Sequence, residues 1–171
     1  MADSGRSAPM TCRAALDAAT QRLAAAGVPD ARRDAQVLLC AALNVDTGVL
    51  MTDPDRLLPD AAAEWFAGMI SDRAARKPVA RILGRRDFWS LTLAVNPATL
   101  DPRPDSETLI ESVLARVKDH SAPLRLLDLG TGTGCLLLAL LKELPTAYGI
   151  GLDRDPAAVA AARQNADRAG L

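Results

Sequence analysis

Three glycines at alternate positions are the feature of this sequence with the clearest chemical meaning. Residues 128–134 read Asp-Leu-Gly-Thr-Gly-Thr-Gly and lie between an apolar run typical of a buried strand and the start of an expected helix. Glycines at this spacing let the backbone turn tightly and approach a ligand that a Cβ atom would exclude, while free N–H groups at the helix start face that ligand. The loop therefore predicts a site for a nucleoside-bearing ligand, lined by Gly130, Thr131, Gly132, Thr133 and Gly134.

Two carboxylates narrow the choice of ligand. The loop has the spacing Gly-x-Gly-x-Gly, which differs from the Gly-x-Gly-x-x-Gly fingerprint of dinucleotide-binding loops. The acidic residue before it, Asp128, suits a ligand with a cationic sulfonium and an amino group better than one with a pyrophosphate. S-adenosylmethionine is such a ligand. Asp153 follows the next expected strand at its C-terminal end, where a carboxylate can accept hydrogen bonds from both ribose hydroxyls.

Each of these features also has a purely structural explanation. The glycines can serve only as a strand-to-helix turn, and Asp153 can begin the cap of the helix that follows it. Their occurrence together, at the ends of successive strands in an expected βαβ unit, favours the ligand-binding interpretation.

The spacing of apolar residues along the sequence predicts which helices and strands position this site. Apolar residues recur at steps of three and four within residues 11–27, 30–44 and 60–76, with a short segment at 47–51, which predicts an N-terminal helical bundle. Trp65 and Phe66 are expected in its core. Alternation over residues 87–95 predicts a β-hairpin, and the prolines of residues 101–104 predict an extended segment before a helix that opens at 105–107.

From residue 124 onward the pattern is strand, glycine turn, helix, strand, helix. The strands are expected at 124–129 and 147–152 and the helices at 135–144 and 156–169. Short apolar strands that alternate with helices indicate a parallel sheet, so the chain is predicted to be α/β, with the first βαβα half of a Rossmann-like domain after the bundle and hairpin. Two strands and their helices cannot cover both sheet faces, so residues 124–171 are expected to be marginal in stability, dimeric or prone to aggregation.

Composition excludes several classes of function. The chain has 20 basic and 21 acidic residues, so it has no global positive field, and direct binding of nucleic acid is not expected. A local run of six basic residues could face RNA or an acidic partner, although such runs are usually solvated helix faces. These residues are Arg73, Arg76, Lys77, Arg81, Arg85 and Arg86.

Cysteine usage and hydropathy suggest a reducing compartment. Cys12, Cys40 and Cys135 are scattered and His120 is the single histidine, so neither a disulfide framework nor a metal site is expected. Cys135 begins an expected helix, where a thiol can be reactive, but a packing role beneath the glycine loop is favoured. The N-terminus has no apolar secretion signal, and the longest uncharged apolar run is seven residues, so no membrane span is expected. The cytoplasm is the expected location.

Together with three further motifs, the glycine loop resembles the release-factor glutamine methyltransferase family (HemK/PrmC). The motifs are Pro-Val-Ala-Arg-Ile-Leu-Gly at 78–84, Asp-Phe-Trp at 87–89 and Leu-Asp-Pro-Arg-Pro-Asp-Ser-Glu at 100–107. The last is similar to the Ile-Pro-Arg-Pro-Glu-Thr-Glu stretch of that family. Many methyltransferases share the glycine loop, but its combination with the Arg-Pro-x-x-Glu segment and the hairpin is specific, and the resemblance spans nearly the whole chain.

The resemblance implies transfer of a methyl group from S-adenosylmethionine to the side-chain amide of the glutamine in the Gly-Gly-Gln motif of a peptide chain release factor. Residues 130–134 would line the cofactor, Asp153 would hold its ribose, and Arg103, Pro104 and Glu107 would lie near the cofactor or the incoming glutamine. The alternative for residues 103–107 is a structural proline turn with a helix cap. The expected domains are a disordered N-terminus (1–10), a helical substrate-recognition domain (11–84), a β-hairpin linker (85–97) and a partial cofactor-binding domain (98–171).

The sequence departs from the family at one motif. Members carry Asn-Pro-Pro-Tyr after the fourth strand, and this motif does not occur in the 171 residues. Its acceptors would hold the amide N–H groups and aim the weakly nucleophilic nitrogen at the methyl carbon. We therefore expect a chain that is truncated before its catalytic residues and inactive alone. Two alternatives remain, a methyltransferase acting on an RNA base or another protein amide, and a non-catalytic module that binds a release factor.

Overall fold

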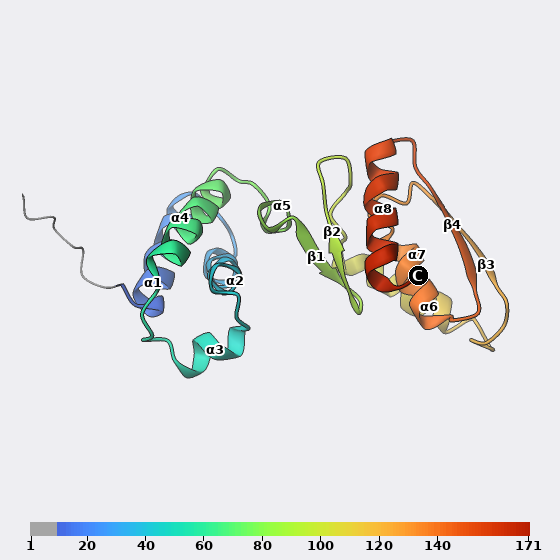
Figure 1. Cartoon of the computed structure of the whole chain (residues 1–171), viewed down its shortest axis with the longest axis horizontal. Coiled ribbons are helices and arrows are strands. Elements are labelled where there is room, and N and C mark those ends of the chain that lie inside the picture. The colour runs from blue at the N-terminus through green and yellow to red at the C-terminus, as the bar shows by residue number, and fades with distance from the viewer. Residues whose placement is uncertain (1–9) are drawn as a thin grey trace, which may run out of the picture. The chain divides into compact units, whose positions relative to one another are not determined.

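The computed structural model describes residues 10–171; the expectation of disorder over residues 1–10 falls, apart from Met10, outside the described residues. Contacts divide the chain into two compact units, with the boundary along the sequence between Leu83 and Gly84 (Figure 1). Each unit has a hydrophobic core of its own.

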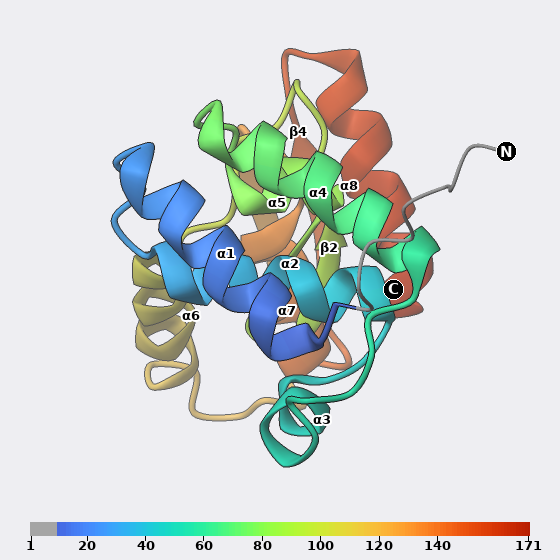
Figure 2. The same cartoon turned by 90° about the vertical axis from the view of Figure 1, so that its left-hand side faces the viewer.

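The first unit is a bundle of helices. It contains α1 (Cys12–Ala25), α2 (Ala31–Leu43), α3 (Thr47–Thr52), α4 (Asp60–Ala74) and α5 (Val79–Leu83). α1, α2 and α4 pack side by side around the core (Figure 2). Local signals fix the ends of the helices. The hydroxyl of Thr11 accepts a hydrogen bond from the Ala14 N–H at 3.2 Å, and α2 ends at Leu43, followed by Asn44, whose φ of 52° is left-handed.

One residue expected in this core lies outside it. Phe66 is 4% exposed, whereas its neighbour Trp65 is 56% exposed. The buried face of α4 consists of Ala62, Phe66, Met69 and Ile70, which recur at steps of three and four. Successive residues of a helix point about 100° apart, so Trp65 projects beside this face. The prediction that Trp65 is a core residue is wrong.

Half of the basic run near the end of this unit binds groups within the unit. Arg73 donates to the carboxylate of Asp34 at 2.6 Å in a largely buried pair, and Lys77 donates to Asp72 at 2.9 Å. The guanidinium of Arg76 donates to the carbonyl of Gly27. The Arg73 contact joins α4 to α2 and the Arg76 contact reaches the loop after α1, whereas Lys77 binds the helix that it follows, so all three charges have partners in the fold.

The second unit begins with an antiparallel hairpin. β1 (Arg85–Phe88) pairs with β2 (Leu91–Ala94), so that Phe88 faces Leu91 across a two-residue turn. Trp89 in this turn has a φ of 55°, which is uncommon for a residue with a side chain. The buried residues of the hairpin belong to the core that also contains Ile110 and the inner face of the first Rossmann helix. The hairpin is therefore part of the packing of this unit.

The remaining elements form the predicted α/β arrangement. A single 3₁₀ turn, η1 (Pro104–Ser106), leads into α6 (Glu107–Leu114). Next come β3 (Arg125–Leu129), α7 (Cys135–Glu143), β4 (Tyr148–Leu152) and α8 (Pro156–Ala169). β3 and β4 are parallel, with Leu127 opposite Ile150. The expected βαβα beginning of a Rossmann-like fold is confirmed. No helix in the described part of the chain is long and apolar enough to cross a membrane.

The two-stranded sheet is covered on one face. α7 and α8 lie on the same side of β3 and β4 (Figure 1). Glycines permit this close packing, because a Cβ atom at Gly149 would lie 2.7 Å from a methyl carbon of Leu137. The other face consists of large apolar side chains that are exposed, namely Leu127, Leu129, Tyr148, Ile150 and Leu152. This is the uncovered face that the sequence predicts.

Candidate functional site

A cavity of about 170 Å³ lies in the second unit, where β3 ends and α7 begins. Two stretches of chain line it. One is the glycine loop with its flanks, namely Asp128, residues 130–133 and residues 135–136, and the other is residues 100–103 with Ser106. The first stretch was predicted from the sequence. In the second, the resemblance placed residues 103–107 near the cofactor or the incoming glutamine, and of these Arg103 and Ser106 line the cavity; residues 100–102 were not assigned, although they belong to the motif at 100–107.

The backbone of the loop requires its glycines. Gly130, Gly132 and Gly134 have φ values of +78°, +56° and +80°, a left-handed conformation that costs other residues about 1–2 kcal/mol. The N–H groups of Gly130 and Thr131 both donate to the carbonyl of Leu152, at 2.8 and 2.9 Å. The loop is thereby fastened to the end of β4.

The three glycines differ in their surroundings. A Cβ atom added at Gly130 or Gly132 would meet nothing within 4 Å, so both face open space at the cavity. A Cβ atom at Gly134 would lie 3.0 Å from Leu138 and 3.4 Å from Ala162. Gly134 therefore serves the packing of α7 and α8, and it does not line the cavity.

Asp153 contacts the loop directly. Its Oδ2 accepts a hydrogen bond from the N–H of Gly132 at 2.9 Å, and its Oδ1 accepts one from the N–H of Asp155 at 3.0 Å. The hydrogen bonds from Asp155 and Gly132 hold the pKa of the Asp153 carboxyl below its usual value, so the group is ionised at neutral pH. A carboxylate has about four acceptor positions, so capacity remains for a ligand's hydroxyl groups.

Asp128 is fixed from within the loop. Its Oδ2 accepts a hydrogen bond from the hydroxyl of Thr131 at 2.8 Å. The absence of a side chain at Gly151 makes this possible, because a Cβ atom there would lie 2.8 Å from the Thr131 hydroxyl oxygen. Neither Asp128 nor Asp153 forms a salt bridge with a basic side chain of residues 10–171. Two carboxylates without paired cations therefore border the loop, which suits a ligand with positive charge.

Cys135 lines the cavity as a neutral thiol. Burial raises the pKa of its thiol, and interactions with the Thr133 hydroxyl and the N–H of Leu136 oppose that rise. A thiol with a raised pKa is a poor nucleophile at neutral pH. Its place beneath the loop is that of a packing residue. Among residues 10–171, no group of three or more potential ligand side chains could hold a metal ion.

Of the three residues assigned by resemblance near the substrate, Arg103 lines the cavity. Pro104 begins η1 and Glu107 begins α6, and neither belongs to the lining. The carboxylate of Glu107 accepts a hydrogen bond from the main-chain N–H of Trp89 at 2.8 Å. The indole N–H of Trp89 donates to Glu143 at 2.8 Å. Glu107 thus stabilises the strained hairpin turn, which is a structural role.

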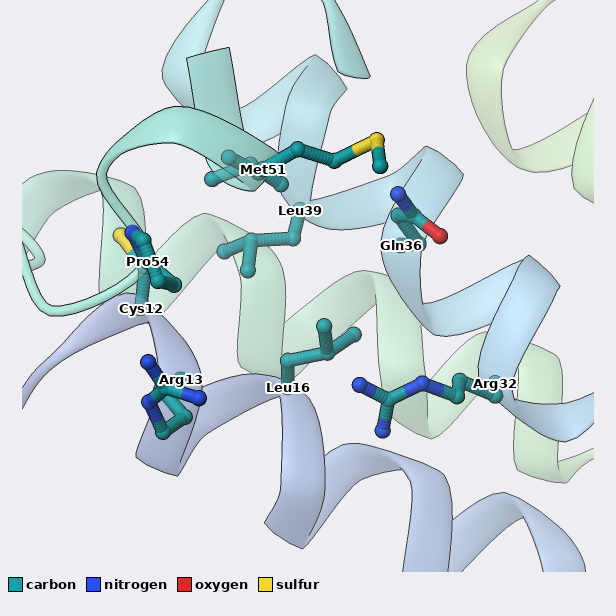
Figure 3. Close-up of a pocket in the computed structure, with 9 residues that line it drawn as sticks. Cys12, Arg13, Leu16, Arg32, Gln36, Leu39, Met51 and Pro54 are labelled. Atoms are coloured by element: carbon teal, nitrogen blue, oxygen red, sulfur yellow. The ribbon is translucent and has the colours of Figure 1, made fainter. Parts of the chain in front are cut away.

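A larger cavity, of about 250 Å³, lies in the helical unit (Figure 3). Its floor is apolar and includes the buried Leu39. Arg13 and Arg32 at its edges are paired with the carboxylates of Asp55 and Asp17, at 2.7 and 3.1 Å. It has no glycine loop and no carboxylate in its lining. The smaller cavity therefore has the features expected for a nucleoside-bearing cation.

The fold and the glycine loop together define a class of protein. Residues 14–84 match the PrmC N-terminal domain, and residues 120–171 match a methyltransferase domain. The chain is thus a methyltransferase-type Rossmann unit preceded by a helical domain of the PrmC type.

The similar proteins share one name. The chain is 46% identical over 156 residues to the release factor glutamine methyltransferase of Rhodospirillum rubrum, covering 91% of this chain and 47% of that protein. It is 48% identical over 158 residues to the one from Cereibacter sphaeroides (92% and 55%) and 44% identical over 164 residues to the one from Vibrio cholerae (95% and 56%). Over about nine tenths of its length, the chain is similar to release factor glutamine methyltransferases. It spans about half the length of the curated relatives it matches.

Proposed function

We propose that the second unit binds S-adenosyl-L-methionine, and that the protein directs its methyl group to the side-chain amide nitrogen of the glutamine in the Gly-Gly-Gln motif of a peptide chain release factor. The observation that most supports the cofactor is the hydrogen bond between the Gly132 N–H and Asp153, which joins the loop and the carboxylate in one site. The names of the relatives support the substrate.

The residues at the site fit the parts of this cofactor. The spare acceptor positions of Asp153 would hold the ribose hydroxyls, and the backbone of residues 130–132 leaves room for a close approach. Asp128 would balance the positive charge, and the guanidinium of Arg103 would pair with the cofactor's carboxylate. The cavity of about 170 Å³ is smaller than the usual 300–1,000 Å³ of small-molecule pockets, so the adenosyl part would extend over Asp153, outside it.

When bound, S-adenosyl-L-methionine supplies a methyl group activated by its positive sulfur. This chain would hold the methyl group in place and exclude other orientations of the bound cofactor. A glutamine amide is a weak nucleophile and needs acceptors for its N–H groups to orient it. No Asn-Pro-Pro-Tyr motif is present in the printed sequence to supply them. We therefore propose that these 171 residues, by themselves, bind the cofactor without transferring the methyl group.

In this proposal the helical unit recognises the release factor. It would do so as a domain covering residues 11–84, followed by the hairpin at 85–97, which packs on the cofactor-binding part at 98–171. The division of contacts after Leu83 and the family match that ends at residue 84 support the first of these boundaries. The partner is a protein in the cytoplasm, and neither nucleic acid nor a membrane is needed as a partner.

Calorimetry with S-adenosylhomocysteine, the demethylated product, tests the cofactor. The wild-type chain should bind it, and Asp153→Asn should weaken binding about tenfold or more, because the ribose hydroxyls donate more strongly to a charged carboxylate than to a neutral amide. Asp167→Asn is the matched control, since this exposed aspartate lies on α8. Its affinity should stay within about twofold of the wild type. Absence of binding by the wild-type chain would refute the proposal.

A second assay tests the substrate and the activity. The chain is mixed with a purified release factor and methyl-labelled S-adenosylmethionine, and label in the factor is measured. We expect co-purification with the factor and no label. Label in the factor would contradict the inactivity of these residues. Failure to bind the factor would contradict the release-factor proposal.

A further inference from the structure

α8 has a polar residue on its buried face. Ala158, Ala161 and Asn165 recur at helical steps on that face, and Asn165 is 1% exposed. A buried amide is costly unless its donors and its acceptor are bound. The partners of Asn165 therefore show what this side chain is for.

Asn165 joins two segments that are distant in the sequence. Its Oδ1 accepts a hydrogen bond from the Ala94 N–H at 2.7 Å. Its Nδ2 donates to the carbonyl of Ala94 at 3.1 Å and to the carbonyl of Thr133 at 2.9 Å. Both N–H donors are used. Ala94 ends β2 and Thr133 lies in the glycine loop, so one side chain holds hairpin and loop to the same helix.

A second amide fastens the hairpin's outgoing chain to α8. The Nδ2 of Asn96 donates to the carbonyl of Ala157 at 3.0 Å, and its Oδ1 accepts from the Ala98 N–H at 2.9 Å. The chain then continues into residues 100–103, which line the cavity together with the glycine loop. The glycine loop, at Thr133, and the chain that leads to residues 100–103, at Ala94 and Asn96, are thus both anchored on α8.

We propose that Asn165 is a positioning residue for the cofactor cavity, because it fixes the separation between the glycine loop and the segment leading to residues 100–103. This inference rests on the proposed function for the identity of the ligand. The loop glycines give its backbone unusual freedom, and a loop that is not already ordered must lose that freedom when the ligand binds. Loss of Asn165 should therefore weaken ligand binding in addition to lowering stability.

The test compares two neighbouring amides changed in the same way. Asn165→Asp keeps the oxygen that accepts from Ala94 and removes both donors. Gln164→Glu makes the same chemical change at an exposed position one residue away. At a temperature where both variants are folded, Asn165→Asp should bind S-adenosylhomocysteine about tenfold more weakly than wild type, and Gln164→Glu less than about twofold more weakly. Amide hydrogen exchange across residues 130–134 should be faster in Asn165→Asp without ligand.

Each outcome decides the proposal. A lower melting temperature in Asn165→Asp with unchanged affinity and unchanged exchange in the loop would show a merely structural role and overturn it. If Asn165→Asp does not fold, Asn96→Ala replaces it, with an expected loss of affinity of about threefold, and unchanged affinity would overturn the proposal. If the wild type does not bind the ligand, the proposed function fails, and the exchange measurement alone decides whether Asn165 orders the loop.

Discussion

Alanine substitution of two glycines of the same loop should have different main effects, one on ligand binding and the other on stability. Gly132→Ala and Gly134→Ala each add one methyl group at a position with a left-handed backbone. The added carbon at residue 132 meets open space beside the cavity, whereas the one at residue 134 meets the side chains of Leu138 and Ala162. The first change should therefore affect ligand binding, and the second should affect folding.

The magnitudes follow from these surroundings. The left-handed conformation costs alanine about 1–2 kcal/mol, and the less flexible unfolded chain returns roughly 0.4–1 kcal/mol, so Gly132→Ala should lower the free energy of unfolding by about 1 kcal/mol. Gly134→Ala has the same balance plus overpacking, since contacts of 3.0 and 3.3 Å with Leu138 force that side chain to move. Overpacking typically costs about 1–3 kcal/mol, which gives a total of about 2–4 kcal/mol.

Urea unfolding followed by circular dichroism measures both free energies, provided that the slope against urea is unchanged. Calorimetry with S-adenosylhomocysteine then measures affinity in the folded range. We expect Gly132→Ala to lose about tenfold in affinity, because its methyl group occupies space at the cavity, and Gly134→Ala to stay within about threefold. Equal losses of stability in the two variants would refute the packing argument. Unchanged affinity in Gly132→Ala would refute the assignment of the open space to the ligand.

Three further predictions concern charge, the thiol and the uncovered sheet face. Hydrogen bonds lower the pKa of Asp153 in the folded chain. The stability that the ionised carboxylate contributes is therefore present above the pKa of about 4 that it has in the unfolded chain, and is lost as the pH falls through the lower pKa of the folded chain. Asp153→Asn should reduce the pH dependence of the urea midpoint in this acidic range. Because burial raises the pKa of the Cys135 thiol, iodoacetamide should modify it more slowly than a free cysteine at pH 7–8, as followed by mass spectrometry. Leu127→Thr combined with Leu129→Thr should reduce aggregation and binding of a hydrophobic dye, while changing the free energy of unfolding by less than about 1 kcal/mol, because both leucines are exposed.

The elements with strong local signals could be predicted from the sequence. α8 has its predicted bounds, because Pro156 and Gly170 mark its two ends. Strand β4 differs by one residue from its prediction. These signals depend on near neighbours in the chain, so contacts with distant residues do not change where the helix or strand ends. The glycine loop was predictable because its left-handed positions require glycine, so that the glycines mark them in the sequence.

Features that depend on distant residues could not be predicted in this way. Trp65 was placed in the core because the apolar residues of α4 are adjacent in sequence, and only the packing of α2 against α4 decides which of them is buried. Glu107 was assigned by family resemblance to the vicinity of the cofactor or the incoming glutamine, and nothing in the sequence indicated that its carboxylate accepts a hydrogen bond from the N–H of Trp89, 18 residues away. Asn165 had one available signal, a polar residue at a helical step from Ala158 and Ala161, but this signal does not reveal the partner of the amide.

The glycine loop is held from outside mainly through its main chain. The carbonyl of Leu152 accepts from two of its N–H groups, Asp153 accepts from the N–H of Gly132, and Asn165 donates to the carbonyl of Thr133. Each of these groups belongs to β4, to the residue after it or to α8. The conformation of the loop therefore depends more on its surroundings than on the side chains of its threonines. For that reason the residues that follow the second strand matter to this site as much as the glycines that first mark it.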